Sequence, residues 1–250
     1  MELMNQNKFN SLPKKDKVIL FLNEVRNYLF PGYFEEIMGT IEEYKRVKKE
    51  ELKTLFLNYI CNDEEKLNNF LIKIERLKFI LKTDIEMTYM SDPASESLDE
   101  IIIAYPGIYA ISVYRIAHVL YELKIPIIPR IMSEYAHSKT GIDIHPGASI
   151  DKYFFIDHGT GIVIGETSVI GHHVKIYHGV TLGALSLKKG QELRGSKRHP
   201  TIGNNVTIYS GACILGGNTV IGDNSTLGCN VFLTESIKEN SKVSIQVKID

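Results

Sequence analysis

The stretch GIVIGETSVIGHHVKIYHGVTLGA, residues 161–184, repeats with a period of six. An aliphatic residue takes every sixth position, at Ile164, Ile170, Ile176 and Leu182, and small or β-branched residues follow four positions later. This period fits neither the roughly 3.6-residue turn of an α-helix nor the simple alternation of an open sheet. It is the length of one flat face plus one corner of a triangular parallel β-helix, whose aliphatic side chains point inward.

The six-residue pattern begins near Gly141 and continues toward the C-terminus. Its other aliphatic positions are Ile144, Ile150, Ile156, Ile202, Ile208, Ile214, Ile221, Leu227 and Leu233. About a dozen repeats, at three per coil, predict roughly four to five coils stacked at about the 4.8 Å spacing of neighbouring strands. One flat side of such a prism is a natural subunit face, so we expect a homotrimer.

The first half of the chain follows a helical spacing instead. In residues 63–82, DEEKLNNFLIKIERLKFILK, apolar residues fall three and four positions apart on one face, and Asn62 or Asp63 is the expected N-cap. The charged stretch EEYKRVKKEE, residues 42–51, is interpreted as solvated surface. Further helices are predicted over residues 16–30, 50–60, 106–123 and 126–138.

These two patterns predict an α+β fold class. An α-helical N-terminal domain, residues 1–139, precedes a left-handed parallel β-helix of hexapeptide repeats, residues 140–250, which includes a C-terminal tail.

Composition excludes several classes of function. The 29 Lys and Arg residues nearly balance the 30 Asp and Glu residues, and a net charge of -1 provides no overall field for nucleic acid or an anionic membrane. No apolar run approaches the roughly 20 residues that span a bilayer, and the N-terminus lacks the order of a signal peptide. The three cysteines lack metal-ligand spacing and suit reduced thiols. We therefore expect a cytoplasmic protein.

The six-residue period slips at three places, and functional groups are often grafted where a repeat is interrupted. The first slip, between Ile156 and Ile164, spans eight residues around DHGTG. The second is the loop GALSLKKGQELRGSKRHP, residues 183–200, which leaves the coil altogether. The third is one extra residue between Ile214 and Ile221, interpreted as an adjusted corner without chemistry.

The first slip carries an aspartate beside a histidine, Asp157 and His158. Asp143 precedes His158 by slightly less than one regular coil of three repeats, so its carboxylate is expected on a neighbouring coil within reach of the imidazole. A histidine held by a carboxylate has a fixed tautomer and is a stronger base, which suits the activation of a hydroxyl for acyl transfer. The alternatives are an ordinary corner residue for His158 and a turn cap for Asp143.

Several stretches together resemble the signatures of the serine O-acetyltransferase family, the cysteine-biosynthesis enzymes. They are DIHPGA at 143–148, DHGTGIVIGE at 157–166, YHGVTLGA at 177–184 and KRHPTIG at 197–203. Upstream, SDPASES at 91–97 and YPGIYAISVYRIAHVLYELKIPIIPR at 105–130 are also similar to that family. The resemblance runs from about residue 85 to about residue 235.

The resemblance implies transfer of an acetyl group from acetyl-CoA to the hydroxyl of L-serine, the first step of cysteine biosynthesis. His158 would be the general base and Asp143 its partner, while Asp92 and Asp157 match the family's aspartates that hold the substrate ammonium. Asp92 could also merely end a helix before Pro93. Cysteine, which mimics serine, is an expected feedback inhibitor in this family.

Residues of the second slip would bind the serine carboxylate and CoA. Arg198 and His199 match family residues near the serine carboxylate, which a guanidinium can hold with two parallel hydrogen bonds. The long, anionic CoA is expected between adjacent prisms, against the basic loop that contains Lys197. The backbone amides of Gly183 and Ala184 are candidates for the thioester oxygen.

Two departures from the family pattern affect its partners. The loop at 183–200 is longer than the family's short glycine-rich version. The tail ENSKVSIQVKID has no proline and ends Ile249–Asp250, whereas the family's C-terminal isoleucine plugs the active site of cysteine synthase; that complex is therefore doubtful here. In the family, helical halves also join two trimers, so a dimer of trimers is the alternative to a trimer.

Three other functions are compatible with parts of the pattern. A hexapeptide acyltransferase with another hydroxyl acceptor, such as a sugar, an antibiotic or a related amino acid, would use the same prism and histidine. A zinc enzyme would need three histidines; His173 and His178 have suggestive spacing, but no third ligand is evident, and no metal is expected. A non-catalytic scaffold would not need the Asp157–His158 pair.

Overall fold

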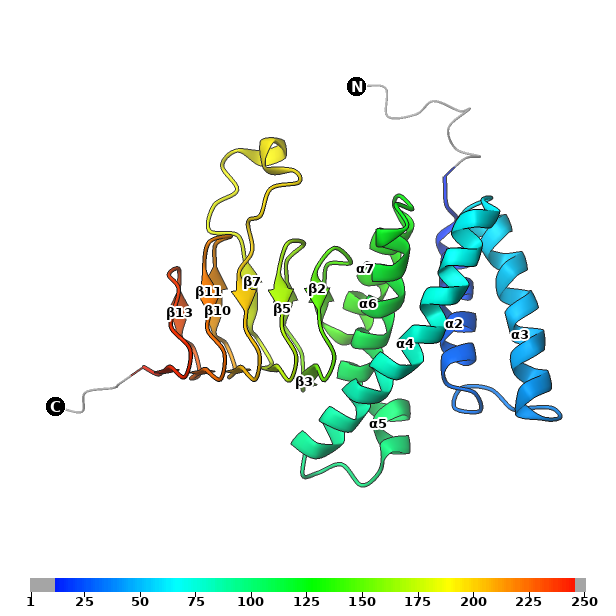
Figure 1. The fold of residues 1–250 in the computed structure, drawn as a ribbon, viewed down its shortest axis with the longest axis horizontal. Helices are drawn as coiled ribbons and strands as arrows, with labels where there is room; N and C mark the ends of the chain where they lie inside the picture. The colour runs from blue at the N-terminus through cyan, green and yellow to red at the C-terminus, as the bar shows by residue number, and fades with distance from the viewer. Residues whose placement is uncertain (1–11, 246–250) are drawn as a thin grey trace.

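The computed structural model describes residues 12–245 as a helical half followed by a three-sided prism of short strands (Figure 1). The helical half comprises α2 (Lys15–Leu29), α3 (Ile41–Leu55), the π-helical turn η1 (Phe56–Ile60), α4 (Glu64–Ser91), α5 (Leu98–Ala104), α6 (Pro106–Glu122) and α7 (Ile128–Thr140). The predicted N-cap of α4 is confirmed, because the side chain of Asp63 accepts a hydrogen bond from the amide of Lys66. The expected fold class, helices followed by a parallel β-helix, is confirmed as well.

Three helical segments differ from the sequence prediction, and one of them, α4, continues to Ser91, nine residues beyond the predicted end at residue 82. Helix α3 begins at Ile41 instead of residue 50, after a capping box between Thr40 and Glu43. The predicted solvated stretch 42–51 also contains Lys48, whose side chain is only 12% exposed because its ammonium contacts three glutamates from α2, α3 and their connection. The short helix α5 was not predicted; the Ser97 side chain caps its first turn.

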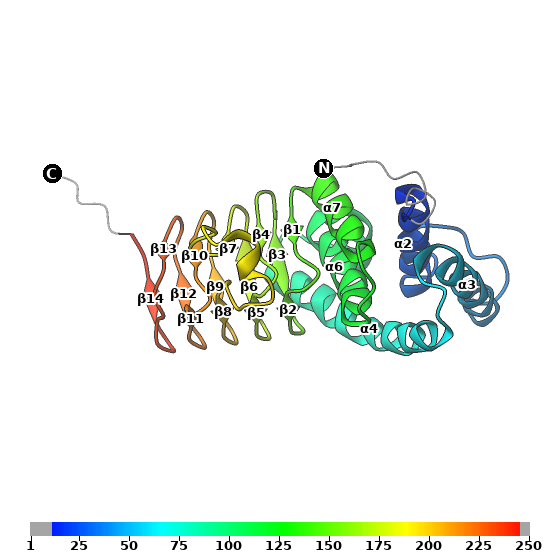
Figure 2. The same cartoon turned by 90° about the horizontal axis from the view of Figure 1, so that it is seen from above.

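The prism consists of three parallel sheets. The first contains β1 (Asp143–Ile144), β4 (Val163–Ile164), β7 (Thr181–Gly183), β10 (Cys213–Leu215) and β13 (Phe232–Leu233). The second contains β2 (Ser149–Ile150), β5 (Val169–Ile170), β8 (Thr201–Ile202) and β11 (Val220–Ile221). The third contains β3 (Phe155–Asp157), β6 (Lys175–Tyr177), β9 (Thr207–Ile208), β12 (Thr226–Leu227) and β14 (Lys242–Val243). The coils stack along the long axis of the molecule, with α6 and α7 beside the first coil (Figure 2).

The strand register locates all three slips in the repeat. Asp143 pairs with Val163 and Val163 pairs with Thr181, so the first of these coils is two residues longer than the second. Thr181 pairs in turn with Cys213, and the long loop lies between them. Cys213 then pairs with Phe232, which is one residue beyond a regular coil. The ladder therefore continues across each insertion, and the extra residues are extruded at corners.

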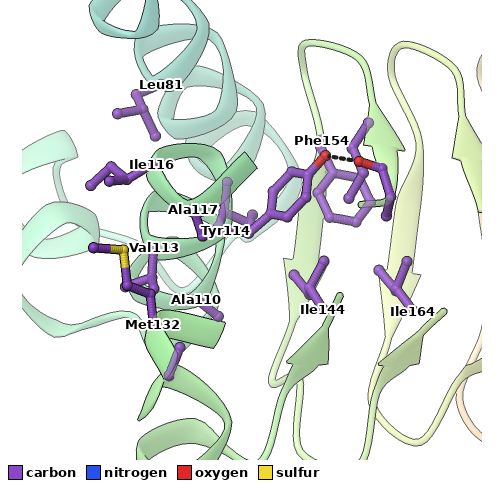
Figure 3. Packing of buried hydrophobic residues seen from close by; sticks show 14 of the residues in the cluster. Leu81, Ala110, Val113, Tyr114, Ile116, Ala117, Met132, Ile144, Phe154 and Ile164 are labelled. Atoms are coloured by element: carbon purple, nitrogen blue, oxygen red, sulfur yellow. Dashed lines mark hydrogen bonds between the residues drawn. The ribbon is translucent and has the colours of Figure 1, made fainter. Parts of the chain in front are cut away.

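The predicted inward aliphatic residues form the core of the prism. All of them are buried except Leu233 at the C-terminal end, which is partly covered. Tyr114 of α6 closes the N-terminal end: its ring lies beside Phe154, and its hydroxyl donates to the carbonyl of Ala148 at 2.6 Å (Figure 3). One continuous hydrophobic cluster therefore runs from the helices into the coils.

A buried ion pair also joins the two halves. The carboxylate of Asp84 on α4 is fully buried and accepts two hydrogen bonds from Arg115 of α6, at 2.8 and 3.0 Å, and one from the amide of Phe154 at 2.9 Å. Arg115 donates further to the carbonyls of Ile150 and Asp151. These bonds fix α4 and α6 against the chain segment that leads into β3.

No single helix among residues 12–245 is long and apolar enough to cross a membrane; α5 and α6, bent by 73°, meet the length and composition criteria only as a pair. The tail residues Ile249 and Asp250, on which the cysteine synthase prediction depends, lie outside the described residues.

Candidate active site

A cavity of about 660 Å³ lies where the end of α4, the start of α6 and the first slip of the repeat meet. Two carboxylates and one imidazole, those of Asp92, Asp157 and His158, line it together with Tyr105 and Thr160. Among the described residues, its lining includes no lysine or arginine. The cavity therefore suits a cationic group on a ligand, close to a group that can accept a proton.

The extra residues of the first slip place His158 at the edge of the cavity. His158 has a φ of +55°, a left-handed conformation that is uncommon for a residue with a side chain, and the corner continues through Gly159 at +90°. A β-carbon at Gly159 would lie 2.4 Å from the side chain of Ile142, so only glycine fits there. The ring of His158 consequently stands outward, with its side chain 76% exposed, edge-on to the ring of His178.

Asp157 and Asp92 approach this imidazole from different elements. Asp157 ends β3, and its Oδ1 lies 3.8 Å from Nε2 of His158. Asp92 follows the last residue of α4; its carboxylate accepts hydrogen bonds from the hydroxyl of Tyr105 at 2.6 Å and the amide of Ala94 at 2.8 Å. These two bonds lower the pKa of Asp92, so its carboxylate is ionised at neutral pH.

Asp143, the expected partner of His158, lies on β1 of the neighbouring coil. Among the described residues, neither hydrogen bonds nor ion pairs join Asp143 to His158. Asp143 lies on the flat first sheet beside Val163, whereas His158 is at the corner before that strand. The first coil runs from Asp143 to Val163 and is longer than a regular coil. His158 therefore follows Asp143 by less than one full coil in the sequence. Within this single chain, the carboxylate that contacts the His158 ring is that of Asp157.

The guanidinium of Arg198 belongs to a second cluster, at the edge between the first and second sheets. Arg198 forms an ion pair with Glu166, and Glu166 also accepts a hydrogen bond from the hydroxyl of Tyr121 on α6 at 3.1 Å. The two charged side chains are about one-fifth exposed, at 20% and 24%. These contacts hold one side of the guanidinium, which has five donor hydrogens.

His199 is buried beneath the same edge. Its Nδ1 accepts from the amide of Thr167 at 3.1 Å and lies 2.9 Å from the Thr167 hydroxyl, so the proton of the neutral ring is on Nε2. The ring also covers Gly165, where a β-carbon would lie 2.0 Å from it. Burial, followed by the positive charge of Arg198, lowers the pKa of His199 to about 4.

Lys197 fastens the returning end of the loop. Its ammonium donates to the backbone carbonyls of Thr167, His199 and Pro200. A lysine has three donor hydrogens, so these carbonyls use all of them, and a CoA phosphate would have to displace one. Its predicted contact with CoA is thus opposed by its own hydrogen bonds, which indicate a structural role.

Gly183 and Ala184 lie where β7 passes into the long loop. The carbonyl of Gly183 accepts from the amide of Gly216, and a β-carbon at Gly183 would lie 2.7 Å from the side chain of Leu215. Close packing between coils therefore explains the glycine at 183 without a ligand. The loop itself projects from the prism on the side away from α5 (Figure 1).

His158 and the four predicted substrate-binding residues thus form two groups on different edges of one prism. Asp92, Asp157 and His158 line the cavity beside α5, whereas Arg198 and His199 surround Thr167 across the first sheet.

The histidines considered for zinc do not form a metal site within the described residues. His173 stacks on Tyr153 with ring centroids 4.3 Å apart, and its Nδ1 lies 2.9 Å from that of His172. His178 contacts His158 instead. Residues 12–245 contain no group of three or more histidine, cysteine, aspartate or glutamate side chains able to hold a metal ion.

Sequence reasoning missed Glu166, Tyr105 and Tyr121. Glu166 ends the quoted stretch DHGTGIVIGE but has no charged neighbour in the sequence, and its partner Arg198 arrives from the far end of the long loop. The two tyrosines look like ordinary helix residues until the fold brings each hydroxyl to a carboxylate.

No protein-family model matches the chain, whereas comparisons with individual proteins give a consistent family. The chain is 40% identical to the protein named serine acetyltransferase, plasmid, of Synechococcus elongatus over 97% of its own length and 85% of that protein. It is 47% identical to Bacillus subtilis serine acetyltransferase over 53% of its length and 58% of the relative.

Solved structures agree with these relatives. The crystal structure of Entamoeba histolytica serine acetyltransferase 1 in complex with L-cysteine matches with a TM-score of 0.79 and 40% identity, over 94% of this chain and 87% of that one. The Neisseria gonorrhoeae enzyme in complex with serine, at 24% identity and a TM-score of 0.67, shares the fold. With near-complete coverage at this identity, the chain belongs to the serine acetyltransferase family.

Proposed function

We propose that His158 is the general base of acetyl transfer from acetyl-CoA to L-serine, and that the cavity beside it binds the amino-acid end of serine. The observation that carries this proposal is the lining of the cavity by described residues: two carboxylates, no basic side chain, and an exposed imidazole at its rim.

The ammonium of serine fits between Asp92 and Asp157. Tyr105 and the amide of Ala94 keep the Asp92 carboxylate ionised, so it presents a negative charge to a cation without needing a proton exchange. Asp157 contributes a second negative charge within 3.8 Å of the imidazole. The serine hydroxyl, two carbons from the ammonium, would then lie beside His158.

His158 would take the hydroxyl proton as the serine oxygen attacks the thioester carbonyl carbon. Collapse of the tetrahedral intermediate breaks the carbon–sulfur bond, and the imidazolium returns the proton to the departing CoA thiolate. This route needs neither a covalent enzyme intermediate nor a metal. Asp143 of β1 stays the proposed carboxylate partner of His158.

Arg198 is proposed to bind the serine carboxylate from a neighbouring subunit. Its guanidinium and the His158 cavity are on different edges of one prism, so one chain supplies only half of a zwitterion site. Packing flat sides of three prisms brings unlike edges together, which supports a homotrimer. His199, buried and neutral, would position Arg198 rather than exchange protons near pH 7.

The groove between neighbouring prisms is also the proposed site of acetyl-CoA. The exposed Lys188, Lys189 and Arg194 of the long loop are better candidates for its phosphates than Lys197, whose donors are used. Gly183 and Ala184 remain candidates for contact with the thioester. Cysteine, which is bound in the E. histolytica structure, is proposed to compete with serine in the same cavity.

Release of free CoA thiol, measured with a thiol reagent, tests this function. With acetyl-CoA, the protein should acetylate L-serine but not sugars or amino acids without a hydroxyl. The variant His158→Ala should lose at least a hundredfold in kcat, in line with loss of a general base, while His137→Ala, an exposed helix histidine, serves as the matched control. Full activity of His158→Ala would refute the role of the imidazole; equal activity on sugars would favour the alternative acceptor class.

A further inference from the structure

A second cavity, of about 390 Å³, lies between α2, α6 and α7, and it contains an arginine that has no counter-ion among residues 12–245. Its lining includes Asn23, Arg26, Tyr109, Tyr135 and Lys139. Asp92, Asp157 and His158 are not part of this cavity, although both cavities use residues 104–106 as a wall.

Arg26 is held by aromatic rings instead of by acids. Its guanidinium carbon lies 4.3 Å from the ring centre of Phe34 and 4.4 Å from that of Tyr109. Its Nε is buried and has no hydrogen-bond partner, and its guanidinium forms no hydrogen bond or ion pair with residues 12–245. The other two arginines that are largely withdrawn from water, Arg115 and Arg198, each pair with a carboxylate.

This arrangement leaves a half-buried charge without an opposite charge nearby: Nε of Arg26 is fully buried, whereas its two terminal guanidinium nitrogens are not. Burial lowers the pKa of Arg26, yet a guanidinium remains protonated at neutral pH. A buried charge without a partner is rare in proteins and is normally compensated by an opposite charge. Two aromatic faces stabilise the cation but leave its in-plane N–H groups unused, and those are the groups that bind a carboxylate or phosphate bidentately.

The remaining lining residues also suit an anion. No aspartate or glutamate of the described chain lines the cavity, and Lys139 adds a second positive charge at its edge. The hydroxyls of Tyr109 and Tyr135 have no hydrogen-bond partner among the described residues, so both are available as donors. Ile102, Ile103 and Pro106 provide an apolar wall for the body of a small molecule.

We propose that this cavity is a binding site for a small organic anion, a carboxylate or a phosphate ester, held by Arg26 with the tyrosine hydroxyls and Lys139. The site is separate from the acetyl-transfer cavity and does not depend on the function proposed for it. The bound anion would supply the negative charge that the described residues do not place beside Arg26.

Isothermal titration calorimetry of the full-length protein with inorganic phosphate and with benzoate, at low ionic strength, tests the proposal. At least one probe should bind saturably, and its affinity should fall at least tenfold in Arg26→Met, which keeps the packing of the side-chain stem but removes the charge. Lys139→Ala should weaken binding less. Lys82→Ala, an exposed lysine on α4, is the matched control and should bind like the wild type.

Three further measurements distinguish the alternative explanations of a binding signal. Arg198→Met removes the basic group of the other cluster, so unchanged binding in that variant excludes the loop as the source of the signal. Without any anion, Arg26→Met should melt at the same temperature as the wild type or above it, because an uncompensated charge is removed, and it should lose the rise in melting temperature that the probe produces. Lack of saturable binding of both probes, or equal binding by wild type and Arg26→Met, overturns the proposal. A change of oligomer mass in Arg26→Met, measured by light scattering, would also overturn it by assigning Arg26 a carboxylate of a second copy.

Discussion

Replacing Asp84 by alanine should strongly destabilise the protein, because it removes the only carboxylate that pairs with Arg115 in the described structure. Arg115 is 5% exposed and cannot lose its proton, so the variant would contain a buried charge. The amide of Phe154 would lose its acceptor at 2.9 Å as well. Breaking a buried ion pair from one side costs about 3–5 kcal/mol in free energy of unfolding.

The opposite single change should cost less. In Arg115→Met, Asp84 is left alone, but burial already raises the pKa of this carboxyl group, so it can become neutral by taking up a proton. The double variant Asp84→Leu/Arg115→Met leaves no buried charge, although the carbonyls of Ile150 and Asp151 lose their donor. We therefore expect it to be more stable than Asp84→Ala by about 2 kcal/mol or more.

Urea denaturation followed by circular dichroism measures these differences, at one protein concentration because unfolding of an oligomer depends on it. Lys73→Ala is the control: it removes an exposed pair with Glu122, worth about 0–1 kcal/mol. A loss below about 1 kcal/mol in Asp84→Ala, or single-variant losses that simply add in the double variant, would refute the assigned role of the pair.

Three other variants test the two site clusters. Glu166→Gln keeps the shape of the side chain but weakens its hold on Arg198, so KM for serine should rise about fivefold with kcat within about twofold, a loss near 1 kcal/mol of binding; an unchanged KM would contradict this. Tyr105→Phe removes a hydrogen bond to Asp92, so the pKa of Asp92 should move up toward its ordinary value and serine should bind about fivefold more weakly, as NMR titration and KM would show. His199 is neutral in the folded protein down to a pKa of about 4, whereas in the unfolded chain it gains a proton near pH 6.5. Stability should therefore fall as the pH drops from 6.5 toward 4, and the fall should be smaller in His199→Gln; equal pH profiles from thermal melts would count against the buried neutral ring.

The β-helix could be predicted from the sequence because every coil requires the same six-residue pattern. An aliphatic side chain at each sixth position fills the prism together with the small or β-branched residue four positions later, so positions such as Ile176 and Val180 are fully buried as expected. The start of helix α3 was harder to predict. Its charged residues suggested bare surface, although the Thr40–Glu43 capping box marks where the helix begins.

The site was predictable where neighbours in sequence are neighbours in space. Asp157 and His158 share one corner, and an interrupted period points to them directly. The pairing of Glu166 with Arg198 depends on the return path of a loop that has no period. The expected pairing of Asp143 with His158 was inferred from the length of a regular coil, and the slip that carries His158 makes this coil two residues longer, so spacing alone could not fix how the two side chains meet.

The long loop at residues 183–200 is held at its base by hydrogen bonds, so its outer part can vary while the coils stay the same. Lys197 and Thr167 tie the returning strand to the coil below, and the ladder from Thr181 to Cys213 passes underneath uninterrupted. Residues 185–195 can therefore lengthen, shorten or be exchanged without disturbing the scaffold that supports them. A graft limited to that interval should therefore give a folded protein in which the coils on either side are unchanged.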